Sequence, residues 1–105
     1  MFNINGEYWR VLLVPPHHFG LLTSDGKFTL GACDDSDKII YIANNLSNYK
    51  TEIVLCHEIT HAAMFSYNIY LTLGQEELLA NLIAHYGDEI IDIKDEVFSK
   101  IIKGE

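Results

Sequence analysis

The segment Ile53–Phe65, with the sequence IVLCHEITHAAMF, restricts most strongly how this chain folds. On a helix each residue turns by roughly 100°, so the apolar residues of this segment surround the axis on nearly all sides. A helix of that kind is typically buried, yet this one contains the polar pentapeptide HEITH. Buried polar groups need partners, because an unsatisfied one is strongly destabilising. The sequence therefore predicts a buried helix, from about residue 48 to 67, whose polar side chains share a ligand.

The spacing within HEITH indicates what that ligand is. His57 and His61 are four residues apart, which places them about 40° apart on one face of a helix. Two imidazoles in this arrangement can bind one tetrahedral zinc ion. Glu58 lies about 100° round the helix from His57, so its carboxylate would lie beside the metal. There it can take a proton from zinc-bound water. The pattern predicts His57 and His61 as zinc ligands and Glu58 as the catalytic general base.

A catalytic zinc usually has three protein ligands, so one more is needed. Some H-E-x-x-H enzymes supply a third histidine six residues after the second, but Tyr67 occupies that position here. The remaining candidates lie in the next predicted helix, GQEELLANLIAHYG, and are Glu76, Glu77 and His85. We favour Glu77 and keep Glu76 and His85 as alternatives.

A helical wheel is the reason for this preference. Glu77 belongs to a narrow stripe of mostly small residues opposite the broad apolar face, and Glu76 falls outside it. Small residues would let the stripe pack closely against the HEITH helix. The stripe consists of Glu77, Ala80, Asn81 and Ala84.

Two further roles remain open in the sequence. Asn81, one turn after Glu77, is either a hydrogen-bond partner of a zinc-binding histidine or an ordinary polar residue of a helix. A side chain that stabilises the transition state is not identified by any pattern. The candidates for it are His17, His18, Tyr67, Tyr70 and His85.

The order of the predicted elements indicates an α+β fold. The first half reads as strands: EYWRVLLV, two short strands in GLLTSDGKFTLGAC around a turn at Ser24–Gly26, and KIIYIAN. After the HEITH helix, two more helices are predicted at about residues 74–86 and 88–102, separated at Gly87, which suits a helix C-terminus. We expect one domain over residues 1–105, with a small antiparallel or mixed β-sheet followed by about three helices.

Composition excludes some classes of partner. The net charge is −8, from 7 basic and 15 acidic residues, so we expect neither nucleic acid nor a membrane as a partner. The N-terminal sequence lacks the features of a signal peptide. The two cysteines, Cys33 and Cys56, do not form a disulfide framework, and we expect both to be reduced. These features favour a cytoplasmic protein, and they leave its oligomeric state open.

HEITH together with a glutamate on the following helix resembles the pattern of the gluzincins. The run from Glu77 to Ala84, ELLANLIA, resembles the E-x-x-A-N/D-x-F-A segment of the ImmA/IrrE-type zinc peptidases, which are common in phages and mobile elements. Ile83 stands where that segment usually has Phe. The resemblance covers roughly residues 39–86 and extends to the compact minigluzincins. It implies a minimal zincin-like metallopeptidase fold, with His57, His61 and Glu77 as zinc ligands and Glu58 as the base.

The resemblance implies a zinc metalloendopeptidase that acts on a polypeptide substrate. The strand Lys38–Asn44 would then be an edge strand that pairs with the extended substrate backbone. One alternative is a binding or regulatory module that contains zinc but lacks turnover, and a weaker one is a zinc hydrolase that does not cleave peptides. An intact Glu58 favours the peptidase, since a structural zinc needs no base.

Overall fold

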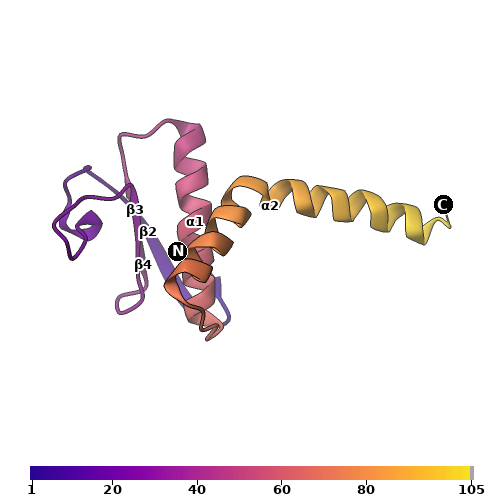
Figure 1. Cartoon of the computed structure of the whole chain (residues 1–105), viewed down its shortest axis with the longest axis horizontal. Coiled ribbons are helices and arrows are strands. Elements are labelled where there is room, and N and C mark those ends of the chain that lie inside the picture. The colour runs from indigo at the N-terminus through magenta and orange to yellow at the C-terminus, as the bar shows by residue number, and fades with distance from the viewer. Residues whose placement is uncertain (105) are drawn as a thin grey trace.

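The computed structural model describes residues 1–104 and has an α+β fold. Four strands form one mixed sheet: β1 (Phe2–Ile4), β2 (Glu7–Val14), β3 (Gly31–Asp34) and β4 (Ile39–Ala43). Two α-helices follow, α1 (Asn48–Ser66) and α2 (Leu73–Ile102). Figure 1 shows the sheet and the two helices, with the second half of α2 running away from the rest of the molecule.

The sheet has the strand order β1-β2-β4-β3. β1 and β2 form an antiparallel hairpin, β2 and β4 are parallel, and β3 pairs antiparallel with β4. Strand β1 was not predicted, although Asn5-Gly6 is a strong hairpin signal. Both residues have positive φ, 51° and 84°, which is the backbone geometry that such a turn needs.

Strand β4 is central in the sheet, so the prediction that Lys38–Asn44 forms an edge strand is wrong. Its backbone is paired on both sides, with β2 and with β3. Its five residues are also all buried, because both faces of the strand are covered. Ile40 and Ile42 pack on the side of α1, and Tyr41 packs on the other side with Leu21. The strand at this end of the sheet is β3.

The segment between β2 and β3 differs in part from the expectation of two short strands. It begins with a 3-10 helix at Phe19–Leu21. The predicted turn is present, because the amide of Gly26 donates to the carbonyl of Thr23 at 3.0 Å. Only one isolated bridge, between Leu22 and Phe28, joins the two sides of that turn.

Helix α1 is fixed at both ends. Its N-cap, Ser47, accepts a hydrogen bond from the amide of Lys50. Near its other end, the Ser66 hydroxyl accepts a buried hydrogen bond from the Trp9 indole nitrogen at 2.8 Å. Trp9 itself is fully buried in the core between α1 and the sheet. These contacts hold the HEITH helix against β2 and fix its direction relative to the sheet.

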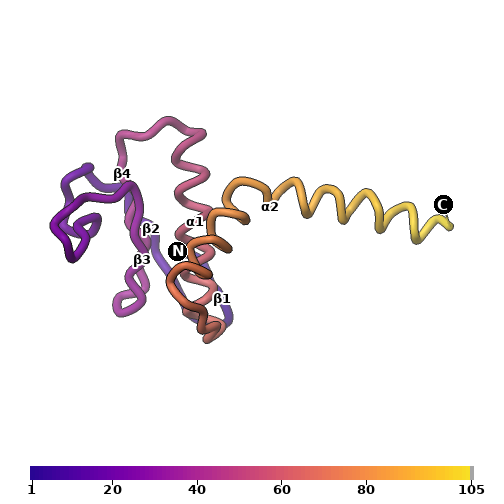
Figure 2. The backbone as a smooth tube through the Cα atoms, in the orientation of Figure 1, coloured from indigo at the N-terminus to yellow at the C-terminus, as the bar shows by residue number. Residues whose placement is uncertain are grey.

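Helix α2 is one continuous helix where two had been predicted, so the expectation of about three helices is wrong. Gly87 lies in its interior and does not end it. A glycine inside a helix costs roughly 1 kcal/mol relative to alanine, which the surrounding helix-forming residues can offset. The helix begins with a capping box, in which Thr72 and Gln75 satisfy each other's backbone amides. Figure 2 shows how its first turns run back across α1.

Candidate metal centre

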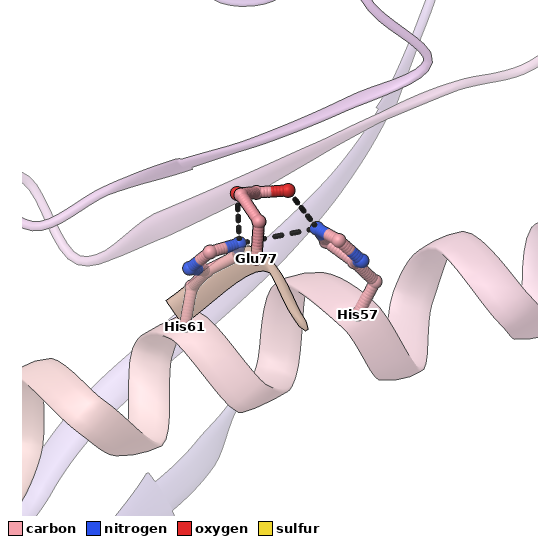
Figure 3. A group of neighbouring side chains, drawn as sticks. All are labelled: His57, His61 and Glu77. Atoms are coloured by element: carbon pink, nitrogen blue, oxygen red, sulfur yellow. Dashed lines mark hydrogen bonds and ion pairs between the residues drawn. The ribbon is translucent and has the colours of Figure 1, made fainter. Parts of the chain in front are cut away.

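His57, His61 and Glu77 form a group that could hold a metal ion. Their ligand atoms all lie within 4.8 Å of one another. Figure 3 shows the three side chains converging from α1 and α2. The two histidines lie one turn apart on α1, as predicted. The short connection between the helices, residues 67–72, brings the first turns of α2 back to them, and with these turns comes Glu77.

The distances within this group suit a tetrahedral ion. The Nε2 atoms of His57 and His61 are 3.1 Å apart. One Glu77 oxygen lies 3.3 Å from His57 Nε2, and the other lies 3.0 Å from His61 Nε2. Ligand atoms that surround zinc tetrahedrally at about 2.0–2.1 Å are roughly 3.3 Å apart. The two nitrogens and the two Glu77 oxygens, each of which faces one nitrogen, therefore have separations close to those of neighbouring ligand atoms around one zinc ion.

Glu76 contacts the opposite side of the His61 ring. Its Oε1 lies 2.6 Å from His61 Nδ1, so the natural arrangement has Nδ1 donating its proton to this carboxylate. In a neutral His61, Nε2 then has only its lone pair, which faces Glu77 at 3.0 Å. The Nε2 lone pair and the Glu77 carboxylate are both acceptors, and two acceptors 3.0 Å apart repel each other unless a positive charge lies between them. A metal ion or an added proton would supply that charge. Glu76 thus holds His61 with Nε2 facing the group that could bind a metal ion.

The sequence did not identify this role of Glu76. The wheel places Glu76 off the stripe that faces the HEITH helix, and it offers Asn81 as the hydrogen-bond partner of a histidine. In the structure, Asn81 lines the cleft, and its carbonyl accepts a hydrogen bond from the His85 ring at 2.9 Å. The contact of Glu76 depends on how α1 and α2 cross, and no residue spacing encodes that crossing.

Glu58 is close to this group and almost fully buried, with 7% of its surface exposed. Burial is the largest influence on its carboxyl group and, with the nearby charge of Glu77, raises its pKa to about 7, while His61 acts in the opposite direction. A carboxyl group with such a pKa exchanges protons near neutral pH. Its location in the same cleft as the two histidines suits a general base.

A cleft of about 370 Å³ opens over these residues. One wall is the chain that leads into β3, Thr29–Gly31, and the others come from α1 and α2. Lys50 also lines the cleft, and the sequence analysis missed it. The spacing alone could have indicated this position, because Lys50 precedes His57 by seven residues and so lies two turns away on the same face of the helix.

Gly31 allows β3 to lie against α1 beside the cleft. A Cβ atom there would lie 2.6 Å from Cγ1 of Val54 and 3.1 Å from Cγ of Glu58, which is too close for a side chain. The absence of a side chain lets the backbone approach Glu58. This places the end strand of the sheet at the rim of the cleft.

The other histidines and tyrosines considered above lie elsewhere, except for His85. His85 lines the cleft but does not belong to the His57–His61–Glu77 group. His18 accepts a hydrogen bond from the amide of Gly20, and His17 packs edge-on against Phe28. Tyr67 caps the end of α1, and Tyr70 in the following loop is 88% exposed.

Both cysteines are free thiols, and neither belongs to the candidate metal group. Burial, with added repulsion from nearby carboxylates, raises the pKa of Cys33 to about 12. Burial also raises the pKa of Cys56, whose thiol faces the carbonyl of Ile83. A raised pKa disfavours the reactive thiolate, as expected of packing residues.

No protein-family model, curated protein or solved structure matches this chain. No helix within residues 1–104 is both long enough and apolar enough to cross a membrane.

Proposed function

We propose that this chain is a zinc-dependent peptidase of the gluzincin type, with a minimal zincin-like fold. His57, His61 and Glu77 would hold the zinc, and Glu58 would be the general base. The observation that carries the proposal is the convergence of two histidine nitrogens and the Glu77 carboxylate, with N–N and N–O separations of 3.0–3.3 Å, next to a buried carboxyl group. When bound, zinc would polarise a substrate carbonyl group and make a water molecule more acidic.

Glu58 supports turnover rather than a purely structural metal site. Its carboxylate would accept a proton from the attacking water and return it to the leaving amine. A base works best when its pKa is close to the working pH, and burial brings that of Glu58 to about 7. A structural metal needs no such neighbour. Glu58 therefore favours an enzyme over a zinc-containing binding module.

The surroundings of the cleft suggest a polypeptide substrate. An extended peptide can add to a sheet through main-chain hydrogen bonds at an unpaired edge. Strand β3 ends the sheet, and the chain at its start, Thr29–Gly31, lines the cleft. We assign substrate pairing to this edge, in place of the central strand β4. A cleft of about 370 Å³ holds few side chains, so the enzyme should be selective.

A peptide-library digest tests this function. Zinc-loaded protein should cleave a limited set of peptides with an extended recognition segment, and casein should be a poor substrate. Glu58→Gln protein should cleave none of them. Cleavage by the variant that survives removal of zinc would come from a contaminating protease, whereas zinc-dependent cleavage at the wild-type rate would exclude Glu58 as the base. If zinc-loaded wild-type protein cleaves no peptide, the protein is better described as a binding module.

A further inference from the structure

The second half of α2, residues 87–102, has a wide apolar surface that no other element within residues 1–104 covers. Figures 1 and 2 both show it extending away from the sheet and α1. Ala80 is the one residue of the whole helix that is fully buried. Seven large apolar side chains in this half are 49–68% exposed: Ile90, Ile91, Ile93, Val97, Phe98, Ile101 and Ile102. We call these seven residues the α2 apolar face.

The α2 apolar face is confined to one side of the helix, where Lys94 interrupts it at about 40° from Ile90. On a helical wheel with Ile90 at 0°, Val97 and Ile101 lie within about 20° of Ile90. The other four residues lie within roughly 120° of it. The opposite side is polar and consists mainly of Asp88, Asp92, Asp95, Glu96 and Ser99. Such amphipathic segments are typical of helices whose apolar side is packed against another element.

The area of this face suits a pair of identical helices. At exposed fractions of 49–68% each of the seven residues exposes about 100 Å², so two copies together would bury at most roughly 1,400 Å², within the range of stable protein interfaces. A monomer rarely exposes an apolar patch of about 700 Å². The face is therefore large enough for a second copy of this chain to be its partner.

The charges along the helix indicate the direction of pairing. The acids Asp88, Glu89 and Asp92 lie in the first part of the segment, and Lys100 and Lys103 lie at its end. Glu89 and Lys100 lie on the same edge of the α2 apolar face, within about 20° of each other on the wheel, whereas Lys103 lies on the polar side. In an antiparallel pair related by a two-fold axis, each edge of one helix lies beside the same edge of the other helix. Glu89 of one copy therefore lies near Lys100 of the other copy. A parallel pair would instead bring this edge beside the opposite edge, where Asp88 and Asp95 lie, so that Glu89 would face like charges.

We propose that this chain forms an antiparallel homodimer through the α2 apolar face, with the two-fold axis near Lys94. A lipid surface fits the helix less well. Its polar side is mostly acidic, whereas helices that lie on anionic membranes are rich in Lys and Arg. The dimer is independent of the proposed peptidase activity, since the face lies outside the His57–His61–Glu77 group.

Sedimentation equilibrium of the full chain tests the dimer. Wild-type protein should have twice the monomer mass at micromolar concentration. Val97→Glu places a charge within the face and should give a monomer, whereas Ser99→Glu on the opposite side should remain a dimer. Circular dichroism checks that both variants are folded, as expected because Val97 is 49% exposed. A wild-type monomer, or a Val97→Glu dimer, overturns the proposal. A monomer that co-sediments with phosphatidylcholine vesicles also overturns it, in favour of a lipid surface.

Disulfide trapping tests the direction of the pair. Lys94→Cys would place two thiols near the two-fold axis, so mild oxidation should link the copies well beyond the wild-type background. Ile101→Cys should not link, because in this antiparallel register the two positions would be about 20 Å apart along the axis. Efficient linking through both positions would indicate a parallel pair and overturn the antiparallel proposal.

Discussion

Glu76 Oε1 lies 2.6 Å from Nδ1 of His61, on the side of the ring opposite Glu77. Two neighbouring glutamates on α2 therefore contact the two nitrogens of one imidazole. The geometry gives the two glutamates different roles. Glu76 can accept a hydrogen bond from Nδ1 of His61, whereas Glu77 belongs to the group of possible metal ligands. The two residues offer a matched pair of variants.

We expect Glu77→Gln to weaken zinc binding more than Glu76→Gln. The first variant removes a charged ligand, whereas the second removes a hydrogen-bond partner of a ligand, a loss that typically costs about 10–100-fold in metal affinity. Competition with a chromophoric chelator measures both affinities. Equal losses, or a larger loss for Glu76→Gln, would mean that the roles are assigned wrongly. A still larger loss for His85→Ala would remove the site from the gluzincin pattern.

Glu58→Gln should keep the zinc and lose hydrolysis. The variant retains the shape of the side chain but cannot take a proton, and loss of a general base typically lowers the rate by about 10²–10⁴-fold. Glu52→Gln, an exposed position on the same helix, is the control and should retain the wild-type rate. Zinc content and the rate on one peptide are measured on the same preparations. A Glu58→Gln enzyme as fast as the control would exclude Glu58 as the base.

The stability of the metal-free protein should fall as the pH rises. Burial raises the pKa of Glu58 from 4.5 to about 7 in the folded state. Protonated Glu58 therefore contributes its full stabilisation of the fold below the pKa that it has in the unfolded state. This contribution is lost as the pH rises through about 7. From pH 5 to pH 8 the loss should be on the order of 2 kcal/mol.

Urea unfolding at these two pH values measures the effect. Metal-free Glu58→Gln should lack this part of the pH dependence, because an amide does not ionise. If the free energies of unfolding of variant and wild type change by the same amount with pH, Glu58 is not the group responsible.

Gly31→Ala should destabilise the fold and push β3 away from α1. The new methyl group would meet Cγ1 of Val54 at 2.6 Å, and overpacking of this kind typically costs about 1–3 kcal/mol. Gly74→Ala is the matched control, because a Cβ there has no atom within 4 Å and the residue lies in a helix. Thermal unfolding should show a lower midpoint for the first variant alone. Val54→Ala should restore part of the loss in a double-mutant cycle, and strict additivity of the two changes would exclude the contact as its cause.

The sequence predicted best what depends on positions within one helix. The relation of His57, Glu58 and His61 follows from their spacing on α1, and the small-residue stripe correctly brought Glu77 to the two histidines. Glu76 was missed because its contact with His61 depends on the crossing of two helices. A wheel describes one helix and contains no information about its partner.

The errors in the fold have similar origins. KIIYIAN was correctly predicted as a strand, but its central place in the sheet depends on β2 and β3, which pair with it from distant parts of the sequence. The local preference of glycine predicts a helix end at Gly87, but this preference is weaker than the helical tendency of its neighbours. In the structure the residues on either side of it continue the helix.

The central claim is that His57, His61 and Glu77 hold one zinc ion. An anomalous difference map, from crystals of untagged protein measured on both sides of the zinc absorption edge, tests it most directly. We predict one peak per chain, about 2.0–2.2 Å from Nε2 of each histidine and from an oxygen of Glu77, and no peak in His61→Ala crystals. Zinc-supplemented wild-type crystals without a peak at this position, or with a peak bound through Glu76 or His85 in place of Glu77, would contradict the claim.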